Sequence, residues 1–204
     1  MTPLTPHLLL ALALFAFVNS ITPGPNNTML MASGANFGFR ATLPHLGGVA
    51  IGFGVMVLAV GLGLGGLFVA FPWLHDVLAV AGGLYMVWLA WKIATSKGMA
   101  GGQAGGRPQT FWQAAAFQWI NPKAWAMAIG AITAYAPAEN YNLNVLLVAL
   151  VFMAVNGPCV AIWTSFGVGL RRFLDRPAVL KAFNVTMALL LLASLIPLAM
   201  EVAG

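Results

Sequence analysis

Long apolar stretches, separated by short polar or proline-containing connections, dominate the pattern along the chain. A stretch such as residues 55–60 is apolar on every side, whereas the strands of a membrane barrel would alternate apolar and polar positions. A bilayer-spanning helix needs about 20 mainly apolar residues and satisfies its own backbone hydrogen bonds in lipid. The pattern therefore predicts six transmembrane helices, over about residues 7–34 (interrupted), 43–70, 73–95, 110–135, 143–169 and 179–200.

The amino-acid composition indicates that these predicted helices lie in a membrane. Of the 204 residues, 61% are hydrophobic and only 6% are charged, and the mean hydropathy is +0.90. Soluble domains carry about 25% charged residues, so this chain has too few charges to cover a water-facing surface. We expect an all-α, polytopic membrane protein with a single transmembrane domain over residues 1–204. Its halves would cover about 1–96 and 110–204, joined by a flexible cytoplasmic loop at about 97–109.

Basic residues lie almost entirely in alternate connections between the apolar segments. The second and fourth connections and both termini hold none. The first, third and fifth connections together hold eight: Arg40, Lys92, Lys97, Arg107, Arg171, Arg172, Arg176 and Lys181. Cytoplasmic loops of membrane proteins carry an excess of Lys and Arg. The pattern predicts a cell inner (plasma) membrane protein with both termini outside. The net charge of +5 then reflects orientation in the lipid bilayer and not nucleic-acid binding.

Two of the six predicted helices are interrupted by polar, proline-containing motifs. Residues 20–26 (Ser-Ile-Thr-Pro-Gly-Pro-Asn) interrupt the first helix, and residues 119–123 (Trp-Ile-Asn-Pro-Lys) interrupt the fourth. Three spans per half place the two halves in opposite orientations across the membrane. Broken helices at corresponding positions of inverted repeats point to a transporter binding site. The sequence therefore predicts two inverted three-helix repeats with broken helices 1 and 4.

The first interruption has the chemistry of an anion site. Pro23 and Pro25 remove two backbone donors, and Gly24 permits dihedral angles that other residues avoid. Backbone groups freed in this way must face protein or a wet cavity. The N-terminus of the following half-helix carries a partial positive charge that suits a carboxylate. Asn26 and Asn27 add neutral donors and acceptors beside it.

A lysine lies deep in the fourth helix. Lys123 is about 13 residues inside its segment, or roughly 20 Å at 1.5 Å per residue. Ionisable residues at such depth usually mark a transport pathway. The alternative is an ammonium group that reaches an interface or satisfies carbonyls freed by Pro122. Asn156, followed by Gly157 and Pro158, makes a third polar position in the fifth helix, where a kink and a ligand contact are equal alternatives.

No Asp or Glu lies deep in any predicted span, so a buried acid is not available as a proton carrier. The proton-coupling candidates are Lys123 and His45, and His45 is more typical of a hydrogen-bonded structural group. The sequence contains no catalytic set, phosphate-binding loop or metal-binding motif, and Cys159 is its one cysteine. We therefore expect no enzyme activity, no cofactor and no metal.

Several motifs resemble one family of membrane proteins. Residues 22–27 (Thr-Pro-Gly-Pro-Asn-Asn) and the run to Arg40 resemble the start of the LysE/RhtB family of amino-acid exporters. Residues 82–92 are similar to its third helix, and residues 118–125 (Gln-Trp-Ile-Asn-Pro-Lys-Ala-Trp) to its second signature. Residues 93–96 look especially like the cysteine and O-acetylserine exporters of this family. The resemblance covers nearly the whole chain and implies export of amino acids or small derivatives, driven by the proton gradient.

The resemblance and the local chemistry together nominate one substrate site. By position, the resemblance implies Pro23 to Asn26 with residues 121–123. The chain departs from the family pattern at residues 183–187, where many members place a glycine, and at Asn156, where others have an acid. The predicted substrate-binding residues are Thr22, Pro23, Gly24, Pro25, Asn26, Asn27, Asn121, Pro122, Lys123 and Asn156.

Two functions remain open from the sequence. The first is a secondary transporter that exports a small zwitterionic amino acid, with the proton as the coupling ion. The second is a passive channel or facilitator for small polar metabolites, which the lack of an intramembrane carboxylate favours slightly. Gly48 and Gly52 have the four-residue spacing that allows close helix packing in lipid. That packing could serve a helix that slides, a static core within one chain, or a homodimer.

Overall fold

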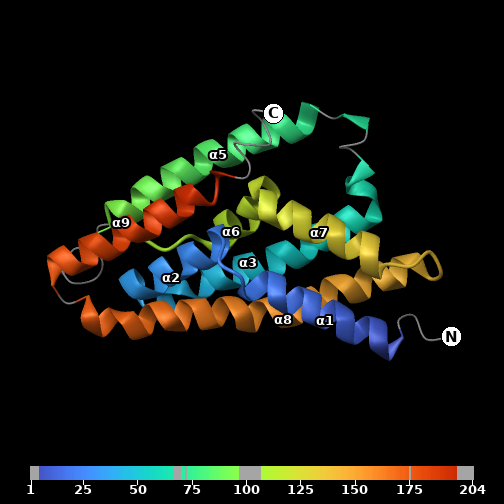
Figure 1. Cartoon of the computed structure of the whole chain (residues 1–204), viewed down its shortest axis with the longest axis horizontal. Helices are drawn as coiled ribbons and strands as arrows, with labels where there is room; N and C mark the ends of the chain where they lie inside the picture. The colour runs from blue at the N-terminus through green and yellow to red at the C-terminus, as the bar shows by residue number, and fades with distance from the viewer. Residues whose placement is uncertain (1–4, 67–69, 72, 97–106, 175, 197–204) are drawn as a thin grey trace.

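The computed structural model describes residues 5–66, 70–71, 73–96, 107–174 and 176–196. This part of the chain is helical, with eight α-helices (Figure 1). Their bounds are α1 (Pro6–Ile21), α2 (Pro25–Phe37), α3 (Phe39–Ala59), α5 (Trp73–Ala94), α6 (Phe111–Phe117), α7 (Pro122–Tyr135), α8 (Tyr141–Leu170) and α9 (Pro177–Ala193). Three short elements are η1 (Val60–Leu64), η2 (Gln118–Ile120) and η3 (Arg171–Phe173). Most of the predicted flexible loop, residues 97–106, lies outside the described residues.

Three helical stretches are long and apolar enough to cross a membrane, namely Phe39–Leu64, Asp76–Ala94 and Tyr141–Phe173. A fourth span results if α1 and α2, which are bent by 56° at their break, count together. The protein is therefore a polytopic helical membrane protein. Helix α9 is apolar, but its 17 residues reach about 26 Å, less than the ~30 Å hydrocarbon core. The fourth predicted segment is divided into α6, η2 and α7, so the count of six spans stays a prediction.

Helix α8 is the longest helix of the described chain and packs against α1, α2 and α3. Figure 1 shows α8 along one side of the molecule and the pair α5 and α9 along the other, with α2, α3 and α6 between them. The Phe53 ring of α3 meets the Phe152 ring of α8 edge to face at 5.2 Å, and both are buried. Because α8 contacts both α1 and α2, it supports the chain on both sides of the first break.

Glycines bring α3 against α6. A Cβ atom at Gly48 would lie 2.3 Å from the carbonyl oxygen of Phe111, and one at Gly52 would lie 2.6 Å from the Cα of Ala115. Any larger residue at either position would therefore push against backbone. The predicted close packing is confirmed, and the partner of both glycines lies within the same chain.

The connection between α2 and α3 is shorter than the sequence suggested. A single residue, Gly38, separates the two helices, with φ of 85°, which favours glycine. Helix α3 therefore begins at Phe39, four residues before the predicted start at residue 43. The assignment of Arg40 to a loop is wrong, because Arg40 lies in the first turn of α3. A one-residue turn leaves no polar run for hydropathy to detect.

Candidate functional site

The break between α1 and α2 follows from its two prolines. In a continuous helix each N–H donates to the carbonyl four residues earlier, so Pro23 and Pro25 withhold donors from Asn19 and Ile21. Thr22 and Gly24 adopt extended backbone conformations between the helices. The carbonyls at the end of α1 must therefore find donors elsewhere.

Side chains from α2, α8 and α7 supply those donors. The Asn27 amide of α2 donates to the carbonyl oxygens of Ser20 and Thr22, both at 2.8 Å. The Trp163 indole of α8 donates to the Ile21 carbonyl at 3.0 Å, which is the acceptor that Pro25 cannot serve. Asn27 is only 4% exposed, so this network is shielded within the protein. A role for Trp163 was not predicted from the sequence. This residue lies 142 positions from Ile21, and no local pattern links the two.

Lys123 connects the two breaks directly. Its Nζ atom donates to the carbonyl oxygen of Thr22 at 2.9 Å and to that of Pro23 at 3.4 Å. The absence of a side chain at Gly24 gives it room, since a Cβ there would lie 3.0 Å from the Lys123 Cδ. One alternative predicted that Lys123 satisfies carbonyls freed by Pro122. Lys123 does donate to freed carbonyls, but they belong to the first break.

The second break has the same logic. Pro122 is the first residue of α7, and the Asn121 side chain caps this helix by accepting the Lys123 N–H at 3.2 Å. The Trp125 indole donates to the Trp119 carbonyl at 2.9 Å. At each break, therefore, a tryptophan indole replaces a lost backbone donor.

The two breaks enclose one small polar cavity of about 30 Å³. Seven of the predicted residues line it: Gly24, Pro25, Asn26, Asn27, Asn121, Lys123 and Asn156. Thr22, Pro23 and Pro122 adjoin these residues in the chain without lining the cavity. The other lining residues, which the sequence did not reveal, are Asn19, Ser20, Phe53, Ala124 and Met127. The Ser20 hydroxyl is buried and has no hydrogen-bond partner within the described part of the chain.

Asn26 is held by a partner from the other break. Its amide donates to Gln118 Oε1 at 2.8 Å, and Gln118 Nε2 donates back to Asn26 Oδ1 at 3.2 Å. Gln118 also donates to the Ala114 carbonyl at 2.9 Å and is fully buried. The reciprocal amide pair orients Asn26 at the cavity wall. Gln118 belongs to the motif at residues 118–125, but the sequence did not predict this role for it.

Asn156 lies in a helix that continues without a break. Helix α8 passes through Pro158, so the sequence interruption at Asn156 to Pro158 does not divide the fifth predicted segment. The Asn156 side chain is nonetheless buried and lines the same cavity as the two breaks. A ligand contact at this residue stays a prediction.

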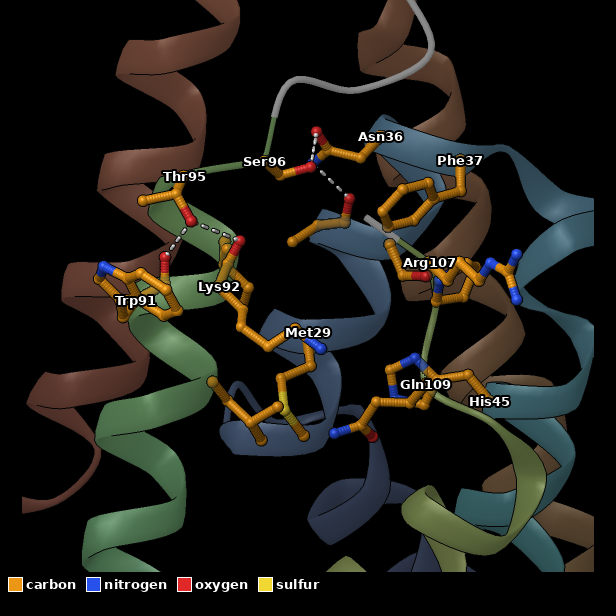
Figure 2. Close-up of a pocket in the computed structure, with 15 residues that line it drawn as sticks. Met29, Asn36, Phe37, His45, Trp91, Lys92, Thr95, Ser96, Arg107 and Gln109 are labelled. Atoms are coloured by element: carbon orange, nitrogen blue, oxygen red, sulfur yellow. Dashed lines mark hydrogen bonds between the residues drawn. The ribbon is translucent and has the colours of Figure 1, made fainter. Parts of the chain in front are cut away.

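The second proton-coupling candidate lies elsewhere. His45 lines a separate cavity of about 210 Å³ between α2, α3, α5 and the segment that precedes α6 (Figure 2). It is 2% exposed, and neither ring nitrogen has a hydrogen-bond partner in the described structure. The structure therefore does not bring His45 and Lys123 together. Among the described residues, no three His, Cys, Asp or Glu side chains are grouped to hold a metal ion.

Sequence comparison adds the family to this geometry. The family profile described as "LysE type translocator" matches residues 17–200, a stretch that contains both breaks and the cavity lining. This chain belongs to the LysE type translocator family. The LysE type translocator is thus a multi-pass membrane transporter and not an enzyme.

Curated relatives resemble this LysE type translocator over nearly their full length. A cysteine/O-acetylserine efflux protein of Escherichia coli O139:H28 is 32% identical over 191 residues, which are 93% of this chain and 96% of the relative. The cysteine/O-acetylserine efflux proteins of Escherichia coli K12 and Shigella sonnei are each 32% identical over 190 residues, 92% of this chain and 95% of theirs. No solved structure gives a significant match. The family expectation from the sequence motifs is confirmed.

Proposed function

We propose that this translocator exports small amino acids or their derivatives across the inner membrane, with cysteine and O-acetylserine as the first candidates. The observation that carries this proposal is the meeting of the two breaks. Lys123 of the second break bonds the Thr22 carbonyl of the first, 101 residues away in sequence, at the wall of one polar cavity. Efflux of cysteine and O-acetylserine by the 32%-identical relatives supports the substrate class.

The transmembrane arrangement in this proposal has six spans. Helices α1 and α2 form the first span, α6, η2 and α7 form the fourth, and α9 belongs to the sixth. The halves are then inverted three-helix repeats, each beginning with a broken span. The proposed orientation has the ends of α5 and α8 and the starts of α3 and α9 at the cytoplasmic side, and the basic residues near these ends support it. Tags at both termini would be cleaved by external protease in cells with a permeabilised outer membrane, and their protection would contradict this orientation.

The substrate carboxylate binds where the carbonyls of Thr22 and Pro23 now hold Lys123. The carboxylate is a better acceptor for an ammonium than a neutral carbonyl, so it displaces them from Nζ. The start of α2, which has no side-chain cap, lies beside Lys123, and a helix N-terminus favours an anion. A space of about 30 Å³ holds about one water, so an amino acid enters only after the two breaks separate. Substrate binding and opening of the cavity are thereby coupled.

A specific observation about proton coupling keeps a facilitator as the second candidate. Neither of the two described cavities has an Asp or Glu in its lining. In the lead proposal Lys123 releases its proton as the cavity empties, with His45 as the alternative carrier. In a facilitator neither residue changes its charge, and substrate simply follows its gradient.

The experiment uses purified protein in liposomes loaded with radiolabelled O-acetyl-L-serine or L-cysteine. The proposal predicts efflux above protein-free liposomes, accelerated when a pH gradient is imposed across the membrane. Efflux that ignores the pH gradient would favour the facilitator. No efflux of these compounds or of a panel of other amino acids would contradict the proposed function.

A further inference from the structure

The larger cavity lies at the opposite end of α2 from the two breaks. The first residues of α2 line the break cavity, and its later turns, from Met29 to Phe37, line the larger one (Figure 2). With about 210 Å³, this space holds about seven water volumes of ~30 Å³ each, or a molecule of similar heavy-atom count. A small amino acid has this size, so the cavity accommodates one without rearrangement.

One wall of the larger cavity carries a cation. Lys92, near the end of α5, lines the space and packs its ammonium over the Trp88 ring at 4.5 Å. Figure 2 shows its amino group extended toward the centre, beside Met29, whereas the Arg107 guanidinium points away. No Asp or Glu is among the lining residues, so the ammonium faces no acid across the cavity. A carboxylate is the group that would complement it.

The facing wall carries buried polar groups without partners. Both ring nitrogens of His45 and the Oε1 atom of Gln109 are buried and make no hydrogen bond within the described structure. Gln109 is oriented by its Nε2, which donates to the Tyr85 hydroxyl at 3.4 Å. Buried polar atoms are normally hydrogen-bonded, and unpaired ones in a cavity indicate a missing polar occupant. A neutral imidazole nitrogen and an amide oxygen are both acceptors, which suits a donor such as an ammonium group.

We propose that this cavity is a second amino-acid site, separate from the breaks, that holds the zwitterion on the cytoplasmic side before translocation. Lys92 binds the carboxylate, and His45 and Gln109 accept hydrogen bonds from the ammonium group. The inference rests on the proposed export function. Helix α2 lines both cavities and so connects this site to the breaks.

The test is equilibrium binding of radiolabelled L-cysteine, under reducing conditions, to the full-length protein in phosphatidylcholine nanodiscs. Replacing Lys92 by Gln should weaken binding about ten-fold or more, the value of a lost hydrogen bond to a charged group. Lys92→Arg should retain binding within a few-fold, because it keeps the charge. Lys181→Gln is the matched control, since Lys181 is exposed on α9 and lines neither cavity. Cysteamine, which lacks the carboxylate, should compete equally weakly in the wild type and in Lys92→Gln.

Further arms separate this site from the breaks and from lipid. Lys123→Ala should keep the L-cysteine binding that depends on Lys92 while losing export. Loss of all binding in Lys123→Ala, with normal binding in Lys92→Gln, would instead place the only site at the breaks. Unchanged binding in Lys92→Gln, or no binding by an exporting wild type, would overturn the proposal. So would L-cysteine binding that phosphatidylglycerol abolishes, because the cation would then hold a lipid phosphate. Binding that depends on Lys92 in a protein that exports no amino acid would instead refute the proposed function alone.

Discussion

The Asn27 side chain offers the sharpest test of how the first break is stabilised. Its amide donates to two carbonyls, those of Ser20 and Thr22, and Thr22 keeps a second donor in Lys123. Replacing Asn27 by Leu therefore removes the side-chain donor of the Ser20 carbonyl, whereas the Thr22 carbonyl loses one hydrogen bond and keeps the one from Lys123. An orphaned buried carbonyl costs about 1–3 kcal/mol. A lost hydrogen bond with a remaining partner costs about 0.6 kcal/mol in membrane proteins.

The sum predicts a loss of about 2–4 kcal/mol in the free energy of unfolding, from those same two values. The assay is thermal unfolding in mild detergent, followed by efflux from liposomes. Asn19→Leu is the matched control, because the Asn19 amide donates to the Phe15 carbonyl inside α1, where the helix already supplies a backbone donor. Equal destabilisation by Asn27→Leu and Asn19→Leu would refute the idea that Asn27 replaces the donors the prolines removed.

Two further predictions concern contacts between helical elements that are distant in the sequence. Gly82→Ala should lower thermal stability and efflux, because its Cβ would lie 2.1 Å from the carbonyl oxygen of Ile120, the last residue of η2. Gly83→Ala is the control and should change neither, because its Cβ would have no atom within 4 Å. Normal stability and efflux in Gly82→Ala would contradict the close contact. Asn184→Leu should cost about 1–3 kcal/mol of stability in a thermal unfolding assay, because it leaves its buried amide partner Asn36 incompletely paired. Thr186→Val removes only an exposed bond within α9 and should have no measurable effect, so equal losses in these two variants would refute that role.

The break positions could be predicted because proline chemistry is local. Pro23, Pro25 and Pro122 each remove a donor wherever they stand, so a helix that contains them must end or open there. Depth in an apolar segment likewise singled out Lys123. Seven of the ten nominated residues line a common cavity, because the two breaks face each other in the fold.

The remainder depends on contacts between distant segments. The Trp163 indole reaches Ile21 across 142 residues, and Gln118 pairs with Asn26 across 92, so no local pattern announces either. The larger cavity around His45 is made by four separate segments and left no motif. Hydropathy also misjudged the start of α3, because the single residue Gly38 makes the whole turn.

Lys123 is the residue at which the central claim can be tested most directly. The measurement is the initial rate of O-acetyl-L-serine efflux from liposomes that contain equal amounts of folded wild type, Lys123→Ala or Lys181→Ala. Export through the meeting of the two breaks predicts that Lys123→Ala loses nearly all efflux while Lys181→Ala matches the wild type. Normal efflux by a correctly inserted Lys123→Ala protein would contradict the account.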